Sequence, residues 1–383
     1  MRFLIIIVFL FSCNNNIPIN NNNIIISNTD NKNTTVLYKK NRPYVLNKKI
    51  IIPENHSLIL KNGVILILKK GGQIINNGSV FFGERTGLDS VFKYNLDKNN
   101  IFFNSKIYSK YNSKIYSNKN GSIFSVNNVF LDGIIIDINK SSLIVQNSLF
   151  LNSSINNNNS DINFKNSFFN KSSIINNNSK IHIVGCLFNK LNGFLINNNI
   201  KNSIINNCLI KNSKEGLKYI SGYNNNIINS VFYNNEISFL IDSKNTGYIK
   251  FYNNLYIKNK LVYHNKDSSQ LYIINNVFDL NKMVLKSELN KKTNKSIISK
   301  NNIFSNNKNL FKLNNIKISN TYCISNTDSI VGYYNVIKDP IYIDSNNFNY
   351  DLNINSPGFR SSVNNKNIGL NISDINIIKY LKY

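Results

Sequence analysis

The stretch NSLFLNSSINNNNSDINFKNSFFNKSSIINNNSKIHIVGCLFN, residues 147–189, contains three successive copies of one short pattern. Each copy ends in an aromatic residue, the anchor, at Phe150, Phe169 and Phe188, and successive anchors are 19 residues apart. Asn precedes the first two anchors by three residues, and Gly185 takes that place in the third copy. Repetition at a short, nearly fixed period is the signature of a solenoid, in which each repeat stacks on the previous one.

The pattern continues on both sides of this stretch, with anchors 19 to 26 residues apart. The ten anchors are Phe130, Phe150, Phe169, Phe188, Ile210, Phe232, Tyr256, Phe278, Phe304 and Cys323. Asn stands three residues earlier in nine copies, at Asn127, Asn147, Asn166, Asn207, Asn229, Asn253, Asn275, Asn301 and Asn320. Asn tolerates left-handed backbone conformations, so we expect this column to turn a corner of the solenoid. We expect the anchors to stack inside it as the core.

Each repeat is too short for two packed helices and is rich in β-branched and aromatic residues, which favour short strands. Three short strands and three turns fit into about 22 residues, and such a coil returns to a point about 4.8 Å above its start. The sequence therefore predicts an all-β fold, a single-stranded parallel β-helix.

Both ends of the repeat region carry further signals. Residues 44–82 contain short apolar runs and include Gly-Gln-Ile-Ile-Asn-Asn-Gly at 72–78. Residues 339–344 read Asp-Pro-Ile-Tyr-Ile-Asp, and residues 356–358 read Ser-Pro-Gly. Together with the repeats, these ends resemble the right-handed parallel β-helix superfamily, the pectate-lyase-like fold, over roughly residues 40–372. The resemblance implies a right-handed solenoid with N- and C-terminal caps. This fold hosts lyases, hydrolases, adhesins and passive scaffolds, so it implies no single activity.

The N-terminus reads Met-Arg, then an apolar run from Phe3 to Phe11, then Ser12 and Cys13. A positive charge, a short apolar run and a small residue before Cys resemble a bacterial lipoprotein signal, with Cys13 as the lipid attachment site. The run is too short to span a membrane. The alternative is an ordinary secretory signal with a chance Cys. We therefore expect a lipid-anchored protein of the cell envelope, at the outer membrane.

The whole chain divides into four predicted parts. These are a signal peptide at 1–12, an Asn-rich tether at 13–35, a β-helix at 36–340 and a closing segment at 341–383. Within the β-helix we expect opening rungs at 44–82, an inserted loop at 104–120 and regular repeats at 121–323.

The chain is strongly basic, with 45 Lys and Arg against 19 Asp and Glu. Cleavage before Cys13 removes Arg2, which leaves 44 − 19 = +25. Such a charge favours acidic partners, namely a uronic-acid polysaccharide, lipopolysaccharide or anionic lipid headgroups. Export argues against nucleic acid. The alternative explanation is that Lys is enriched, like Asn and Ile, because the genome is AT-rich.

Cys186 and Cys208 both stand two residues before an anchor and are 22 residues apart, so we expect them on adjacent rungs. They could form a disulfide in an exported protein, or fill a core column as two small thiols. Cys323, at an anchor position, is expected in the core.

An enzyme similar to pectate lyase would need Ca²⁺-binding carboxylates beside a strong base. The mature chain has Arg only at Arg42, Arg85 and Arg360, all outside the ten repeats, which excludes an Arg base on a central rung. His56, His182 and His264 appear isolated in the sequence. We predict no metal site and no cofactor, with Ca²⁺ a candidate cofactor only if the protein is a lyase.

Two acids are the weak catalytic candidates. Glu215 and Glu236 follow their anchors by five and four residues, so we expect them on neighbouring rungs of one face, where they could act as acid and base. Asp242 and Asp267 have a similar phase. The alternative is that all four are solvated acids that balance Lys.

The predicted loop 104–120 contains Ser-Lys-Ile-Tyr-Ser twice, at 105–109 and 113–117. Its duplicated side chains, Lys106, Tyr108, Lys114 and Tyr116, could hold a charged sugar by ionic contact and ring stacking. The alternative is an edge hairpin. We therefore predict an envelope β-helix lipoprotein with a structural or glycan-binding role, and the sequence favours a non-catalytic protein over a polysaccharide lyase or glycoside hydrolase. The alternative function is a polysaccharide lyase acting on an anionic glycan.

Overall fold

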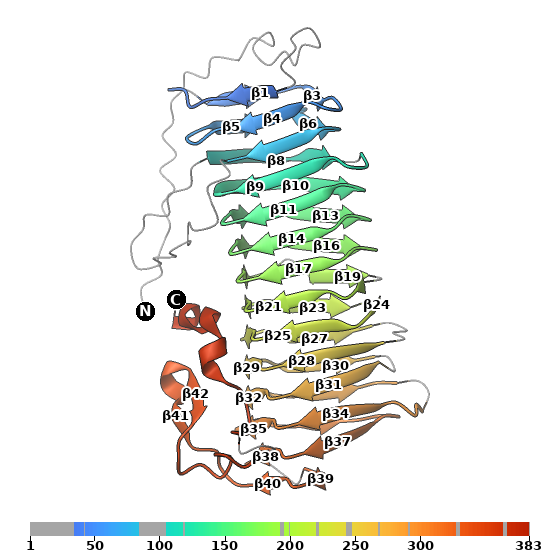
Figure 1. Cartoon of the computed structure of the whole chain (residues 1–383), viewed down its shortest axis with the longest axis vertical. Coiled ribbons are helices and arrows are strands. Elements are labelled where there is room, and N and C mark those ends of the chain that lie inside the picture. Colours follow the sequence, from blue (N-terminus) through green and yellow to red (C-terminus); the bar gives the residue numbers. More distant parts are fainter. Residues whose placement is uncertain are drawn as a thin grey trace.

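The computed structural model describes residues 34–41, 43–83, 105–117, 119–191, 195–198, 200–219, 222–242, 247–266, 269–289, 292–326, 330–362 and 366–382. The described chain winds into a right-handed solenoid of short parallel strands, as predicted (Figure 1). Cys13 and the predicted signal and tether before Thr34 lie outside the described residues. Strand β1 (Thr34–Leu37) begins two residues before the boundary predicted at residue 36.

Three ladders of parallel strands form the walls of the solenoid. Sheet A is a 14-stranded ladder that runs the whole length of the described solenoid. It contains β1, β4 (Ser57–Leu60), β7 (Ser79–Phe82), β9 (Ile123–Asn127), β11 (Ser142–Gln146), β14 (Ile162–Lys165), β17 (Ile181–Val184), β21 (Ile204–Asn206), β25 (Asn225–Ile228), β28 (Tyr248–Tyr252), β31 (Gln270–Ile274), β34 (Ser296–Lys300), β37 (Lys317–Thr321) and β39 (Gly332–Tyr333).

The other two walls, ladder B and ladder C, are joined through β8 (Ser105–Ser117) and β10 (Val129–Asn139), which turn the corner between them without interruption. Ladder B also contains β2 (Tyr44–Leu46), β5 (Ile65–Leu68), β12 (Leu149–Leu151), β15 (Phe168–Asn170), β18 (Leu187–Asn189), β22 (Leu209–Lys211), β26 (Val231–Tyr233), β29 (Leu255–Ile257), β32 (Val277–Asp279), β35 (Ile303–Ser305), β38 (Ile324–Ser325) and β40 (Val336–Ile337). Ladder C also contains β3 (Lys49–Ile52), β6 (Gln73–Asn76), β13 (Ser154–Asn158), β16 (Ser173–Asn177), β19 (Leu195–Asn198), β23 (Glu215–Tyr219), β27 (Ile237–Ile241), β30 (Leu261–Asn265), β33 (Leu285–Ser287) and β36 (Phe311–Lys312).

A few small elements lie outside the three walls. They are the strand pair β20 (Ile200–Lys201) and β24 (Gly222–Tyr223), the antiparallel hairpin of β41 (Tyr342–Asp344) and β42 (Asn349–Leu352), and the 3₁₀ turns η2 (Ser345–Asn347), η4 (Ile372–Asp374) and η5 (Asn376–Lys382). Within the described residues, no helix is long and apolar enough to cross a bilayer.

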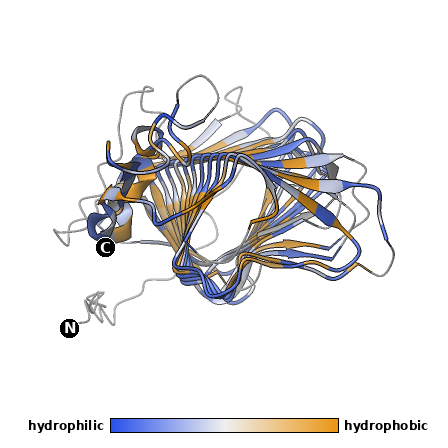
Figure 2. Ribbon diagram, turned by 90° about the horizontal axis from the view of Figure 1, so that it is seen from below, coloured by the Kyte–Doolittle hydropathy of each residue, from blue (hydrophilic) through white to orange (hydrophobic). Residues whose placement is uncertain are grey.

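The predicted anchors stack inside the solenoid from Phe150 to Phe304. The ladder pairs Phe150 with Phe169, Phe169 with Phe188 and so on without a break. Ring centroids of Tyr256 and Phe278 are 4.9 Å apart with an interplanar angle of 5°. Figure 2, a view along the axis, shows the rungs superposed around one interior. The anchor column therefore forms part of a single continuous core.

The predicted Asn corner is also present. Asn147, Asn166, Asn207, Asn229, Asn253, Asn275 and Asn301 all have a left-handed backbone, with φ between 47° and 57°. Gly185, the exception in the sequence pattern, has φ 66° at the same corner. Asn and Gly share this place because both adopt positive φ at low cost.

The anchor assignments at the two ends of the repeat series are wrong. Leu131, not Phe130, pairs with Phe150, because β10 enters ladder B one residue later and its corner is at Asn128 rather than Asn127. At the other end Ser325, not Cys323, pairs with Phe304. The sequence did not reveal these shifts, because apolar residues also occur next to the true positions in both places.

Cys186 and Cys208 lie on adjacent rungs, since their neighbours Leu187 and Leu209 pair in the ladder. Both are fully buried free thiols, which confirms the core-column interpretation over the disulfide. Burial raises the pKa of Cys208 to about 12, so this thiol stays protonated and unreactive at neutral pH. Cys323 is also a buried free thiol.

A column of polar side chains turns inward at the corner between ladders B and C. In the upper rungs, those nearer the N-terminus, it consists of serines such as Ser153, whose Oγ accepts the Ile134 N–H at 3.2 Å. In the lower rungs it becomes Asn235, Asn259, Asn281 and Asn307. We call this column the corner ladder. It satisfies backbone groups that a tight buried corner would otherwise leave unpaired.

The closing segment packs against the outer side of ladder B rather than across the end of the solenoid (Figure 1). Its apolar residues Leu352, Leu370 and Ile377 bury Leu209 and Val277 of the ladder.

A hydrogen bond fixes the closing segment to this wall. The Tyr350 hydroxyl donates to the buried Asp279 carboxylate at 2.8 Å. Burial, helped by the Asp279 charge, raises the pKa of Tyr350, so this donor keeps its proton.

Candidate functional site: a charged patch on ladder C

Five charged or titratable side chains gather on the outer surface of ladder C. They come from β23, β30 and β33 and from the residues just after β27 and β33. We call them the histidine patch, consisting of Lys218, Asp242, His264, Lys286 and Glu288.

The ladder register brings the histidine patch together. Lys218 pairs with Leu240, Leu240 with His264, and His264 with Lys286, so these side chains form one outward column. The column continues to Lys312 on β36. Because rungs are about 4.8 Å apart, neighbours in this column lie within reach of one extended ligand.

Three ion pairs connect this column with the next outward column. His264 Nε2 lies 2.8 Å from Glu288 Oε2, and Lys286 Nζ contacts the other oxygen of the same carboxylate. Lys218 Nζ lies 3.1 Å from Asp242 Oδ2. The His264 side chain is 13% exposed, against 46% for Glu288, so the ring is mostly sheltered while its partner faces solvent.

Hydrogen bonds from Lys286 and then from His264 lower the pKa of Glu288 to about 2. The carboxylate is therefore charged throughout the neutral and mildly acidic range. Because its folded pKa lies below its ordinary value, the stabilisation from this pairing is present above about pH 4.5 and disappears as the pH falls toward 2. Since Glu288 is exposed, this contribution is small and is screened by salt.

The histidine patch offers two kinds of chemistry. Its ammonium groups can pair with carboxylates of an acidic ligand. An imidazole whose Nε2 is held by a carboxylate has a fixed ring orientation, as required of a general base. Within the described residues, no group of three or more His, Cys, Asp or Glu side chains is arranged to hold a metal ion.

The sequence interpretation treated His264 as isolated, which is wrong, because its ring pairs with Glu288. The sequence did contain the information that groups these residues, namely the distance of each one from its anchor. Lys218, Leu240, His264, Lys286 and Lys312 each follow their anchor by eight residues. Asp242 and Glu288 follow theirs by ten, and an even difference of two positions keeps a side chain on the same face of a strand.

Glu215 and Glu236 lie on neighbouring rungs, but they are offset by one position. Glu215 pairs with Ile237 in the ladder, so Glu236 lies beside Lys214 rather than beside Glu215. A one-residue offset sends side chains in different directions, so the register does not stack the two carboxyls. Asp267 lies outside the described residues.

Residues 105–117 form a strand of the solenoid wall rather than an inserted loop or an edge hairpin, so both interpretations of this segment are wrong. The two copies of Ser-Lys-Ile-Tyr-Ser fit because each supplies alternating residues to a different wall. Lys106 and Tyr108 lie on ladder B, and Lys114 and Tyr116 on ladder C.

The duplicated side chains have different surroundings. The Tyr108 ring packs edge-on against Phe130 with centroids 5.5 Å apart. Lys114 Nζ lies 5.6 Å from the centre of the Tyr116 ring and 3.6 Å from Asp137 Oδ2, and that carboxylate raises the pKa of Lys114. Because a corner of the solenoid separates the two copies, their side chains cannot form one sugar-binding site. Only Lys114 and Tyr116 share the wall that carries the histidine patch.

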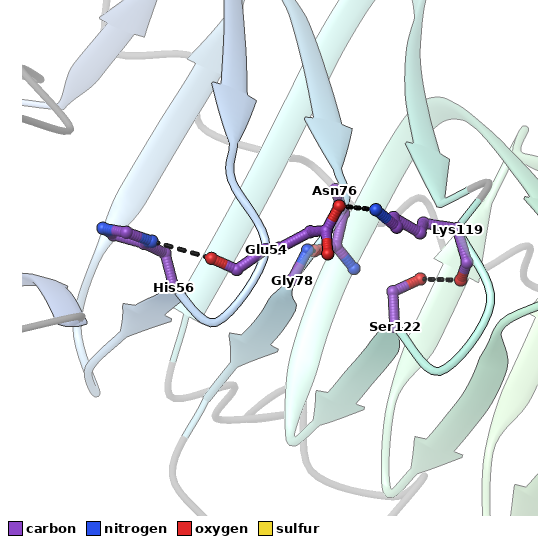
Figure 3. Close-up of polar contacts among 6 residues, drawn as sticks. All are labelled: Glu54, His56, Asn76, Gly78, Lys119 and Ser122. Atoms are coloured by element: carbon purple, nitrogen blue, oxygen red, sulfur yellow. Dashed lines mark hydrogen bonds and ion pairs between the residues drawn. The ribbon is translucent and has the colours of Figure 1, made fainter. Parts of the chain in front are cut away.

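A second polar cluster closes the corner between ladder C and sheet A near the first rungs (Figure 3). Glu54 pairs with Lys119, and the His56 ring bonds the Glu54 carbonyl oxygen at 2.9 Å through Nδ1. Asn76 Nδ2 donates to the Ile123 carbonyl oxygen at 3.0 Å. These contacts mostly satisfy backbone groups of the turns, so we assign them to the corner's structure.

No family model and no curated protein matches the chain. Among solved structures, the chain is similar to the periplasmic alginate epimerase AlgG, with 13% identity, a TM-score of 0.54, and coverage of 80% of this chain and 77% of that one. It also aligns with an endo-xylogalacturonan hydrolase from Aspergillus tubingensis, at 10% identity over 80% of this chain and 92% of that one, but the TM-score of 0.26 is too low to support an argument.

The likeness to the epimerase concerns the fold, since the identity is too low to carry over residues. It agrees with the ladder pairing, the left-handed corners and the stacked core described above. The chain is a right-handed parallel β-helix protein with the pectate-lyase-like fold.

Proposed function

We propose that this protein binds an acidic polysaccharide along ladder C. The observation that carries the proposal is the outward column of Lys218, His264, Lys286 and Lys312. It places positive or titratable groups on four of five successive rungs, with Leu240 on the rung between Lys218 and His264. Lys114 and Tyr116 extend the same wall toward the first rungs. The net charge of the chain, +26, favours a polyanion as well. The structural neighbour, named as an alginate epimerase, makes a polyuronate the first ligand to test.

Binding to immobilised alginate should be strong at low salt and should weaken steeply as salt rises, since exposed charges are screened beyond about 8 Å at physiological ionic strength. The triple variant Lys218→Ser, Lys286→Ser and Lys312→Ser should bind about tenfold or more weakly, because each exposed ammonium–carboxylate contact contributes about 0.5–1 kcal/mol. Retention on alginate and on a neutral glucan, measured across a salt series, provides the test.

Two matched controls separate a site from diffuse charge. Lys165→Ser, Lys180→Ser and Lys317→Ser removes the same charge from exposed positions outside ladder C. The duplicated motif gives the second control. Replacing Lys106 and Tyr108 by Ser alters ladder B, whereas replacing Lys114 and Tyr116 by Ser alters ladder C. Equal losses within each comparison would mean that only net charge is sensed, and no retention at low salt would refute the proposal.

The His264–Glu288 pair favours one alternative function, a lyase acting on the same class of glycan. In such an elimination a base removes the proton beside the uronate carboxyl, the glycosidic C–O bond at the next carbon breaks, and a carbon–carbon double bond forms. The leaving oxygen takes up a proton from the protonated base or from water. His264 would be the base, and Lys286 would pair with the uronate carboxylate. Unsaturated uronate in the alginate mixtures, absent with His264→Gln, would favour the lyase over a binding protein.

We also propose that a lipid on Cys13 anchors the protein to the cell envelope, at the outer membrane. The support is the apolar run from Phe3 to Phe11 followed directly by Ser12 and Cys13. Cys13→Ala should abolish incorporation of a labelled acyl chain and release the protein from the membrane fraction, or leave it unprocessed. A variant that keeps both the label and the membrane fractionation would contradict this assignment.

A further inference from the structure

The last rung of the solenoid ends in two strand edges. In the described part of the chain, β39 pairs only with β37, and β40 pairs only with β38. The closing segment does not cover this end, because it turns away and packs along the side of ladder B (Figure 1). Backbone groups on the outer edges of β39 and β40 therefore face away from the solenoid, where another strand can pair with them.

The same rung presents a group of exposed apolar side chains. Val331 is 78% exposed, Tyr333 74%, Tyr334 72% and Ile337 59%. The Tyr334 ring stacks on Tyr322 with centroids 4.9 Å apart, which holds it in place. We call Val331, Tyr333, Tyr334 and Ile337 the apolar end. Exposed apolar residues combined with open strand edges are typical of a protein–protein contact.

The first rung has a different character. Its exposed side chains include Lys39, Lys40, Lys48 and Lys49. Clustered Lys on an edge prevents strand pairing, because a second copy would bring like charges together. On the last rung, Lys338 and Asp339 stand next to each other with opposite charges, so this end lacks that repulsion.

These observations indicate which partner binds the apolar end. A surface that is apolar and carries little net charge is complementary to itself, and self-complementary contacts close as two-fold dimers. An arrangement of first rung against last rung would instead bury the four Lys of one copy against apolar side chains of the next, at a cost in desolvation.

We propose that two copies of this chain associate end to end through β39 and β40. Related by a two-fold axis across the solenoid, the terminal strands of the two copies pair, and the apolar end of each copy covers that of the other. Assembly stops at two, because the Lys-bearing first rungs are left at the outer ends. This inference is independent of the proposed glycan site, which lies on a side wall.

Sedimentation equilibrium of the whole chain over a range of concentrations tests the proposal. The native protein should form a dimer and no larger species. Tyr333→Lys with Ile337→Lys should weaken dimerisation at least tenfold, and because both side chains are exposed, the variant should retain the circular dichroism spectrum and melting temperature of the native protein.

The matched control places the same substitutions on the first rungs. Tyr38 and Ile51 are 62% and 48% exposed, and Tyr38→Lys with Ile51→Lys should remain a dimer. Loss of association in this control as well would indicate first-rung-to-last-rung stacking and would overturn the two-fold pairing. A native protein that is monomeric at every concentration would also overturn it, as would a dimer unaffected by the changes at Tyr333 and Ile337.

Discussion

Replacing Phe232 by alanine should lower the free energy of unfolding by about 3–5 kcal/mol. Phe232 is fully buried, lies between Ile210 and Tyr256 in the anchor column, and stacks on the Tyr256 ring with centroids 5.0 Å apart. Truncation removes apolar contacts and leaves a cavity that the stacked rungs above and below cannot fill. Urea unfolding followed by circular dichroism would measure the loss.

The control for Phe232 is an exposed side chain on a nearby rung. Lys260→Ala should change the free energy of unfolding by less than about 0.5 kcal/mol, as is usual for surface positions. Glu288 is unsuitable as this control, because it pairs with His264 and Lys286. Similar losses for Phe232→Ala and Lys260→Ala would contradict the core assignment.

Replacing Asn259 by leucine should cost about 2–5 kcal/mol, although leucine is the more apolar residue. Asn259 Oδ1 accepts the Asn235 N–H at 3.0 Å, and Asn259 Nδ2 donates to the Phe232 carbonyl oxygen at 2.9 Å. Leucine would leave the buried Asn235 N–H unpaired and would remove the side-chain bond to the Phe232 carbonyl oxygen, at about 1–3 kcal/mol each. The same unfolding measurement applies.

Serine at the same position separates hydrogen bonding from packing. Asn259→Ser keeps an acceptor for the rung above, as Ser213 does for the Leu191 N–H at 3.1 Å, so its cost should be smaller than that of leucine. If leucine proved the milder change, the corner ladder would not be contributing through its hydrogen bonds.

The fold could be predicted because one period and two constraints recur together. An Asn or Gly that must adopt positive φ and an anchor that must be buried keep a fixed distance, and that distance survives loops of different length. The prediction failed where the corner itself differs. β8 and β10 pass from ladder B to ladder C without a break, and the first repeat on β10 is shifted by one residue.

The histidine patch could not be found by searching for local motifs. His264 and Glu288 are 24 residues apart, and only the ladder register makes them neighbours. The register can be read from the distance of each residue from its anchor. Residues at equal distances are neighbours in the ladder, whereas residues at unequal distances are not. Glu215 and Glu236 lie at unequal distances of five and four from their anchors, whereas His264 and Lys286 share a distance of eight. The ligand itself leaves no such trace, because Lys is frequent on every wall.

The corner ladder gives the solenoid a direction along its axis. In the upper rungs a serine hydroxyl such as that of Ser153 takes part in one bond to the next rung, whereas in the lower rungs the Asn259 amide bonds both the rung above and the rung below. Stability in a repeat protein is close to a sum over rungs and their interfaces. Thermal opening should therefore begin in the serine half and travel toward the asparagine half. We expect the early rungs to unfold first, while the half of the solenoid that carries His264 remains folded.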